Sequence, residues 1–273
     1  MLQEELLKGP YAIICRGHSG SRLLCEAFRQ NRIWMGLSDN PTRDSYEFRQ
    51  DNPAVRYLIQ AGFHYAELNE TAREQVRNLV TTLIEESRQN CPDLSQVVAF
   101  GWKRAIMTYA CEIFLDAYPS ARTVHLIRDG RDAMLSRLRS RMAQLDDPIN
   151  RLVVFGNPGI THYRDKAINQ QVVNEYRNEF EMHHWVTAVR FGMRARRYGD
   201  RYLEVRYEDL CRDPENTMAG VFEFLDVPFL ASTRDWVKAN ASVRSVGKWR
   251  GREEELKDAI QIGEPLLTEL GYA

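Results

Sequence analysis

Short apolar runs alternate with stretches of helical spacing along most of the chain. The runs are rich in β-branched and aromatic residues and predict strands at 11–15, within 31–36, and at 97–102, 123–127 and 202–207. Because strands and helices alternate, we expect parallel pairing with right-handed crossovers. The pattern therefore predicts an α/β fold, a parallel β-sheet flanked by helices, in which ligands bind beyond the carboxyl ends of the strands.

The other periodic stretches predict helices, with two irregular segments between them. Apolar residues recur at helical spacing at 23–28, 69–89, 105–117, 133–138, 170–198, 214–225 and 253–270. Residues 37–52 are polar and rich in turn formers, which is typical of a loop. Residues 145–169 contain two prolines, two glycines and little periodicity, and we interpret them as a lid or insertion within a single domain spanning residues 1–273.

The turn after the first strand has the composition of an anion-binding loop. Gly17 and Gly20 can adopt backbone angles that are closed to other residues, and the next helix begins with free N–H groups. Side chains that can add donors or positive charge surround these glycines, namely Arg16, His18, Ser19, Ser21 and Arg22. An ordinary glycine turn capped by Ser19 has the same pattern. The loop lacks the Gly-x-x-x-x-Gly-Lys-Ser/Thr pattern, which disfavours a nucleoside triphosphatase.

Basic residues follow three separate predicted strands. Arg16 follows the first, Lys103 and Arg104 follow the strand at 97–102, and Arg128 and Arg131 follow the strand at 123–127. The whole chain has a net charge of −1, so this grouping does not reflect a general basic excess. The carboxyl ends of parallel strands share one edge of a sheet, and we therefore expect a focused anion pocket there.

Composition excludes several classes of protein. The 273 residues are 44% apolar and 27% charged, and the net charge of −1 argues against a nucleic-acid partner or a polybasic membrane anchor. Residues 1–9 lack a signal-peptide pattern, and no apolar run is long enough to span a bilayer. Five scattered cysteines match neither a disulfide framework nor a zinc site, so we expect a reduced, cytoplasmic protein. The adjacent His183 and His184 do not share a helix face, and no metal site is expected.

Four blocks, in order along the chain, resemble the sulfotransferases that use 3′-phosphoadenosine 5′-phosphosulfate (PAPS). They are Arg16 to Leu24, Ile127 to Ser136, Val205 to Leu210 with Asp213-Pro214, and Ser245-x-x-Lys248-Trp249. The resemblance implies the P-loop-like sulfotransferase fold and a PAPS cosubstrate. It also implies cofactor-binding roles: the 5′-phosphosulfate against residues 16–22, the 3′-phosphate held by Arg128 and Ser136, the adenine near Tyr207, and a loop with Ser245, Lys248 and Trp249 closing over the phosphates.

The resemblance also nominates catalytic residues. The family usually has Lys or Arg directly before the Ser-Gly pair, whereas this chain has His18 there and Arg16 two residues earlier, so either side chain could fill that role. Gly101-Trp102-Lys103 resembles a block of the carbohydrate and tyrosylprotein members, in which the lysine approaches the transferred group. Asp44 and Glu47 are the candidate bases for the proton of the acceptor hydroxyl.

The resemblance implies an enzyme that transfers a sulfuryl group from PAPS to a hydroxyl of a saccharide, a lipid or a small metabolite, without a metal. Two other functions fit an anion loop. One is a P-loop-type phosphoryl transferase, which would require Mg²⁺ and ATP. The other is a nucleotide-binding regulator without turnover. The sequence does not identify the acceptor or the oligomeric state.

Overall fold

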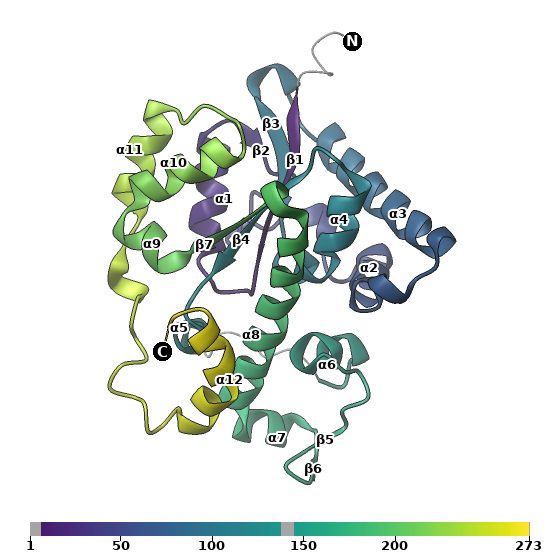
Figure 1. The fold of residues 1–273 in the computed structure, drawn as a ribbon, viewed down its shortest axis with the longest axis vertical. Helices are drawn as coiled ribbons and strands as arrows, with labels where there is room; N and C mark the ends of the chain where they lie inside the picture. Colours follow the sequence, from purple (N-terminus) through teal and green to yellow (C-terminus); the bar gives the residue numbers. More distant parts are fainter. Residues whose placement is uncertain (1–6, 138–144, 273) are drawn as a thin grey trace.

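Five parallel strands form the central sheet, in the order β2-β3-β1-β4-β7 (Figure 1). The structure, a computed structural model, describes residues 7–137 and 145–272. The strands are β1 Lys8–Cys15, β2 Ile33–Trp34, β3 Ala99–Lys103, β4 Arg122–Ile127 and β7 Tyr202–Arg206. The predicted α/β fold with a parallel sheet is therefore confirmed.

β1 lies at the centre of the sheet and sets the register of its neighbours. Its last six residues are buried, as expected for a strand covered on both faces. Ile13 is paired with Lys103 of β3, and Cys15 is paired with Leu126 of β4. The three strands consequently end at the same edge, which is the edge that the sequence predicts for the site.

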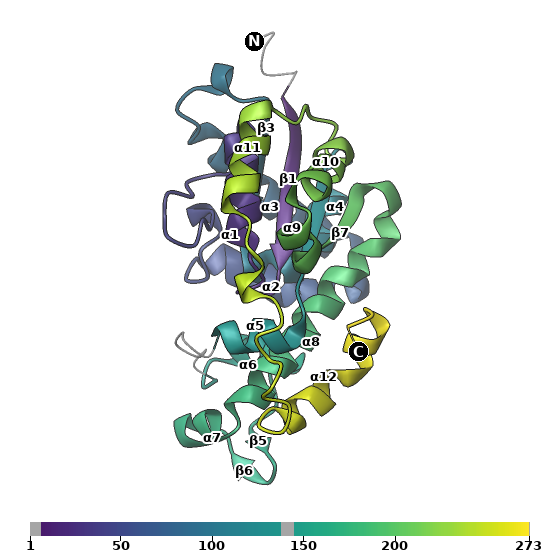
Figure 2. The ribbon, with the colours of Figure 1, turned by 90° about the vertical axis from the view of Figure 1, so that its left-hand side faces the viewer.

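Helices cover both faces of the sheet and continue below its carboxyl edge (Figure 1). Alternate side chains of β1 point into two different cores, with Ile14 in one and Ile13 in the other. On one face lie α1 Ser21–Gln30, α9 Tyr207–Arg212, α10 Pro214–Phe224 and α11 Ala231–Asn240; Figure 2 shows α1 beside α11. On the other face lie α2 Pro53–Phe63, α3 Glu70–Gln89 and α4 Cys111–Ala117.

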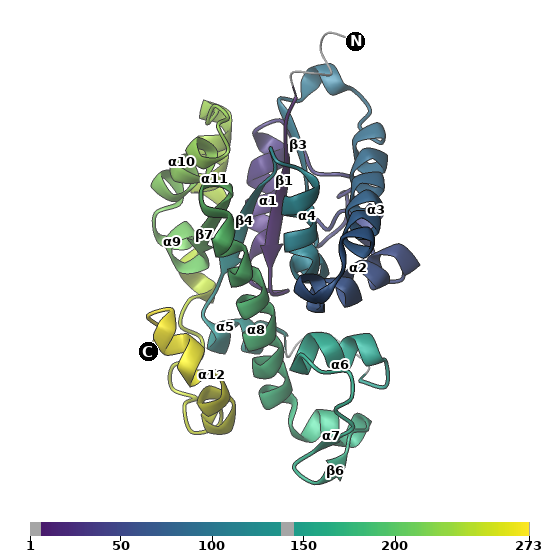
Figure 3. The same cartoon turned by 45° about the vertical axis from the view of Figure 1, so that its right-hand side comes forward.

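The lower part of the molecule is built around α8 Arg177–Met193 (Figure 3). This helix contacts α5 Gly130–Arg137, α6 Pro148–Phe155 and α12 Lys257–Glu269. α7 Gln170–Glu175 precedes it, after a two-stranded hairpin of β5 His162–Tyr163 and β6 Lys166–Ala167. No helix in the described part of the chain is long and apolar enough to cross a membrane.

Two predicted helices differ from those in the structure. The stretch 170–198 is broken into α7, α8 and a 3₁₀ segment at 194–201, where Gly199 has non-helical angles of φ 58° and ψ −118°. The stretch 105–117 begins as a 3₁₀ segment at 105–110 and becomes α-helical only at Cys111. Apolar spacing alone does not distinguish one long helix from several short ones in series.

The segment 145–169, predicted as a lid or insertion, folds as α6 and the β5–β6 hairpin. The Asp147 carboxylate caps α6 by accepting a hydrogen bond from the Ile149 amide at 2.9 Å. It also pairs with both terminal nitrogens of Arg56 in α2, at 2.9 and 3.1 Å. This ion pair holds α6 beside α2.

A buried histidine connects β4 to β7. His125 is completely buried, and its Nδ1 lies 2.6 Å from the Tyr202 hydroxyl. Gly192 of α8 packs on the ring so closely that a Cβ there would lie 2.2 Å from it. Burial lowers the pKa of His125 from 6.5 to about 4.

This shift makes folding stability sensitive to acid. Between about pH 6.5 and 4, unfolded His125 binds a proton that the folded ring excludes, so stability decreases as pH falls. We expect His125→Gln to remove about 2 to 3 kcal/mol of the loss that urea unfolding records between pH 6.5 and 4.5. The control is His64→Gln at an exposed histidine. Equal pH dependence in wild type and His125→Gln would contradict the assignment.

Candidate active site

A cavity of about 520 Å³ lies at the carboxyl edge of the sheet. The strand ends Arg16, Lys103 and Arg128 all line it. The other predicted site residues in its wall are Gly17, His18, Gly20, Ser21, Arg22, Asp44, Ser136, Tyr207 and Ser245. A second cavity of about 720 Å³ adjoins it and shares Gly20, Arg22, Tyr207 and Ser245. Strand ends that are far apart in sequence thus meet in one place.

The loop before α1 has the backbone of an anion cradle. His18 and Gly20 have φ values of 70° and 87°, in the left-handed region. A Cβ at Gly20 would lie 2.1 Å from the Tyr207 ring, so only glycine fits there. Gly20 is the N-cap residue of α1, and no side-chain hydrogen bond caps this helix. The amide of the buried Ser19 donates to the Arg16 carbonyl at 3.2 Å and closes the turn before it. The first turn of α1, starting at Ser21, therefore directs its free N–H groups at this loop.

Arg16 connects the loop to α8. Its guanidinium is buried, donates from Nη1 to the Gly17 carbonyl at 2.7 Å, and forms an ion pair through Nη2 with Glu181. The Glu181 side chain is 3% exposed, so neither charge is in contact with bulk water. His18, by contrast, is exposed. Arg16 and His18 are the two candidates for the basic position of the loop. Of these, Arg16 is bound to α8 through its ion pair with Glu181.

Lys103 is enclosed by the segment that precedes α2. Its Nζ donates to the Thr42 carbonyl at 2.7 Å and to Asp44 Oδ1 at 2.8 Å. Its backbone N–H donates to Ser45 Oγ at 2.9 Å, and its carbonyl accepts from the Ser45 amide at 2.8 Å. Asp44 also lies 3.5 Å from Nη1 of Arg104. Segment 42–45 therefore fixes the ammonium group of Lys103 at the cavity wall.

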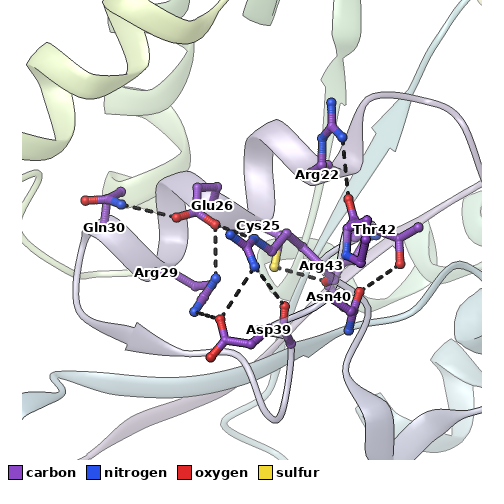
Figure 4. Close-up of polar contacts among 12 residues, drawn as sticks. Arg22, Cys25, Glu26, Arg29, Gln30, Asp39, Asn40, Thr42 and Arg43 are labelled. Atoms are coloured by element: carbon purple, nitrogen blue, oxygen red, sulfur yellow. Dashed lines mark hydrogen bonds and ion pairs between the residues drawn. The ribbon is translucent and has the colours of Figure 1, made fainter.

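Charged side chains of α1 pair with Asp39 and Arg43, before and within this segment (Figure 4). Arg43 pairs with Glu26 at 2.8 Å, and Arg29 pairs with Asp39 at 2.5 Å. Arg43 has a φ of 57°, an uncommon value for a residue with a side chain. α1 thus carries the anion loop at its start and the support for Lys103 along its outer face.

Arg128 bridges the two sides of the cavity. Its Nη1 donates to the His18 carbonyl at 3.0 Å, its Nη2 donates to the Ser245 carbonyl, and its guanidinium lies 4.6 Å from the Tyr207 ring centroid. Its Nε is buried and has no hydrogen-bond partner among the described residues. Ser136 of α5 lines the same cavity. Burial raises the pKa of Tyr207 to about 12, so its hydroxyl remains protonated at neutral pH.

The structure does not bring Lys248 and Trp249 to the cavity with Ser245. The Asp132 carboxylate accepts from the amides of Gly247 at 2.6 Å and Trp249 at 3.3 Å. The Trp249 ring stacks on Arg131 at 3.7 Å, and Lys248 is exposed outside the cavity wall. The second half of the Arg-Asp-Gly-Arg-Asp block therefore holds this loop in place.

Glu47 also lies apart from the cavity. Its carboxylate is buried and accepts from the Leu37 amide at 3.0 Å and from Asn90 Nδ2 at 3.3 Å. It supports the start of the 37–52 loop. Of the two candidate bases, only Asp44 lines the cavity.

Several cavity residues were not predicted from the sequence. They include His184 and Ala188 of α8, Asn150 and Val153 of α6, and Gln50, Ile106 and Tyr109. Glu181, His184 and Ala188 share one helix face, and this spacing is the sequence signal that could have pointed to His184 and Ala188. No group of three or more His, Cys, Asp or Glu side chains suited to a metal ion occurs among residues 7–137 and 145–272.

A model of the sulfotransferase family matches residues 12–231. The chain belongs to the sulfotransferase family. The fold is similar to the sulfotransferase domain of the olefin synthase from Synechococcus PCC 7002, with 20% identity, 95% coverage of both chains and a TM-score of 0.51. It is also similar to the sulfotransferase domain from the curacin biosynthetic pathway, with 18% identity, 83% and 77% coverage of this chain and that one, and a TM-score of 0.50. A comparison with curated proteins gave no match.

The predicted family is thus confirmed. The likeness to the two solved domains confirms the sulfotransferase fold as well.

The buried Arg16–Glu181 pair generates a prediction about this sulfotransferase. Glu181→Gln removes the carboxylate charge from a buried ion pair, so we expect a loss of roughly 3 to 5 kcal/mol in urea unfolding. The control is Glu269→Gln, because Glu269 is 40% exposed in its pair with Arg190. That variant should lose less than about 1 kcal/mol. Similar losses in the two variants would show that Arg16 does not depend on Glu181.

Proposed function

We propose that this sulfotransferase transfers a sulfuryl group from PAPS to the hydroxyl of an organic acceptor. The observation that carries the proposal is the meeting of the α1 loop, Lys103 and Arg128 in one cavity. Among the described residues of its wall, five cationic side chains face a single carboxylate: Arg16, Arg22, Lys103, Arg104 and Arg128 against Asp44. Such a wall suits a polyanionic donor.

The residues present fit the two ends of PAPS. The 5′-phosphosulfate would lie on the loop at 16–22, where amides at the start of α1 are available. Arg128 and Ser136 would hold the 3′-phosphate, and Nε of Arg128, which has no hydrogen-bond partner in the described part of the chain, leaves a donor for it. The adenine would occupy the adjoining cavity, between Tyr207 and Trp236. Gly20 lines both cavities, and a Cβ there would overlap the Tyr207 ring.

The chemistry requires positive charge near the leaving oxygen. As the bond from sulfur to the 5′-phosphate oxygen breaks, negative charge grows on that oxygen, and a fixed cation stabilises the transition state more than the bound substrate. Lys103 is the candidate, because its ammonium group is positioned by Thr42 and Asp44 before any ligand binds. His18 lies on the donor loop and would add charge there when protonated.

The acceptor would enter from the side of α6 and α8. Ile106, Val153 and Ala188 supply apolar surface there, and Gln50 donates to Asn150 Oδ1 at 3.0 Å. This mixed wall suits a small hydroxyl compound with an apolar body.

All five cysteines are free, and four of them are buried, which supports a reducing, cytoplasmic location.

Transfer of ³⁵S-labelled sulfate from PAPS to a panel of phenols, aliphatic alcohols and saccharides tests the proposal. We expect Lys103→Ala to lower kcat by about 10²- to 10³-fold while the Kd for 3′-phosphoadenosine 5′-phosphate (PAP) changes little. The control is Lys166→Ala on the exposed hairpin. Hydrolysis of ATP without any sulfate transfer would favour a phosphoryl transferase. PAP binding without transfer would favour a regulator.

A second prediction tests the 3′-phosphate assignment. Arg128→Ala removes charge-assisted hydrogen bonds that only a 3′-phosphate can accept, so we expect the Kd for PAP to rise roughly 10- to 100-fold. The Kd for adenosine 5′-phosphate, which lacks that group, should change far less. Calorimetry on wild type, Arg128→Ala and Arg190→Ala measures both constants. An equal rise in Kd for the two nucleotides would mean that Arg128 only holds the loops at His18 and Ser245 in place.

A further inference from the structure

One peptide group directly after β4 is held at both of its polar atoms. It joins Arg128 to Asp129. Its carbonyl oxygen, which belongs to Arg128, accepts from Nε1 of Trp185 in α8 at 3.0 Å. Its N–H, which belongs to Asp129, donates to Oε1 of Glu208 in α9 at 3.0 Å. Because the carbonyl and the N–H of a trans peptide point in opposite directions, two helices hold this peptide from opposite sides.

Both contacts are shielded from water. Trp185 is completely buried, and Glu208 is 6% exposed. A buried polar group that loses its partner is costly, so hydrogen bonds of this kind persist in the folded protein. The next residue, Gly130, packs so closely on Trp185 that a Cβ there would lie 2.6 Å from the indole ring. The turn that follows Arg128 is therefore restricted to one geometry.

The same peptide carries the Arg128 side chain. The guanidinium bonds the carbonyls of His18 and Ser245, which a phosphate would outcompete, and it lies 4.6 Å from the Tyr207 ring centroid. Tyr207 directly precedes Glu208 at the start of α9. The first residue of α9 thus contacts the guanidinium, and the second contacts the peptide from which that side chain extends.

Glu208 also has a second partner, which suggests a different role. Its Oε2 accepts from the Tyr272 hydroxyl at 2.9 Å. The Tyr272 carbonyl accepts from Arg131 at 2.6 Å, and its ring lies 4.6 Å from the Arg206 guanidinium. Glu208 could therefore serve only to anchor the segment after α12. Since each carboxylate oxygen has its own partner, variants can separate this role from an effect on Arg128.

We infer that Glu208 is a positioning residue for the 3′-phosphate site, acting through the peptide between Arg128 and Asp129; this inference rests on the proposed function. Glu208 does not belong to the described walls of the two cavities, so its effect on a ligand is indirect. A guanidinium that is already oriented loses less conformational freedom when a phosphate binds. Glu208 thereby increases the preference for nucleotides that carry a 3′-phosphate, and Trp185 does so from the other side of the peptide.

Calorimetry with PAP and with adenosine 5′-phosphate tests the inference. The ratio of the two Kd values measures what the 3′-phosphate contributes to binding. Glu208→Met keeps the length of the side chain but removes its acceptors, so we expect the ratio to fall about 5- to 20-fold through weaker PAP binding. Glu208→Gln keeps a carbonyl oxygen for the Asp129 N–H and should hold the ratio within about twofold of wild type. Trp185→Phe removes the other contact and should also lower the ratio.

Two control variants separate positioning from general damage. Tyr272→Phe removes the hydrogen bond to Oε2 and leaves Oε1 in place, so the melting temperature should fall while the Kd ratio stays within about twofold of wild type. Asp209→Ala changes the next residue of the same Tyr-Glu-Asp block. The Asp209 side chain is 57% exposed, and its replacement should leave both Kd values unchanged.

Three results would overturn the inference. One is an equal rise of both Kd values in Glu208→Met, because a distorted fold weakens both nucleotides alike. Another is a ratio that falls as far in Tyr272→Phe as in Glu208→Met, and the third is a wild-type chain without any preference for PAP. If Glu208→Met does not fold, an unchanged ratio in Trp185→Phe overturns it instead. A chain that prefers PAP but transfers no sulfate contradicts the proposed function alone, and the Kd ratios still decide the role of Glu208.

Discussion

The pairing of β1 with β3 and β4 is the constraint on which the site depends. Because all three strands end at one edge, Arg16, Lys103 and Arg128 are brought into one cavity. Cations in a shared cavity repel one another, and each requires an acceptor for its hydrogen bonds. The fold supplies Glu181 for Arg16 and Asp44 for Lys103, whereas the described hydrogen bonds of Arg128 go to backbone carbonyls.

The partners of these three cations differ in how easily a ligand can replace them. The pair of Arg16 with Glu181 is buried, and breaking a buried ion pair is strongly destabilising, so we assign it to the scaffold. Asp44 is 20% exposed and contacts two cations. Lys103 can therefore turn an N–H group toward a ligand while Asp44 stays paired with Arg104. Arg128 bonds neutral carbonyls, which a phosphate readily outcompetes.

The sequence was sufficient to predict features that depend on short-range pattern. Apolar runs located the sheet, and the rule that parallel strands end together predicts that Lys103 and Arg128 lie at one edge. Features that depend on distant partners could not be predicted. Glu47 accepts a hydrogen bond from Asn90, 43 residues further along the chain, and Asp132 accepts one from the Trp249 amide across 117 residues. Neither partner has a signature in the sequence around it.

The two histidines of α8 illustrate the same limit at the scale of one residue. Adjacent positions on a helix differ by about 100° in direction, so which of the pair meets the cavity depends on the rotation of the helix about its axis. The sequence of α8 does not fix that rotation, since apolar and polar residues occur on all of its sides. Glu181 fixes it through Arg16, and Trp185 fixes it through the backbone of Arg128. The contacts of α8 with Arg16 and Arg128 therefore also decide that His184, and not His183, lines the cavity.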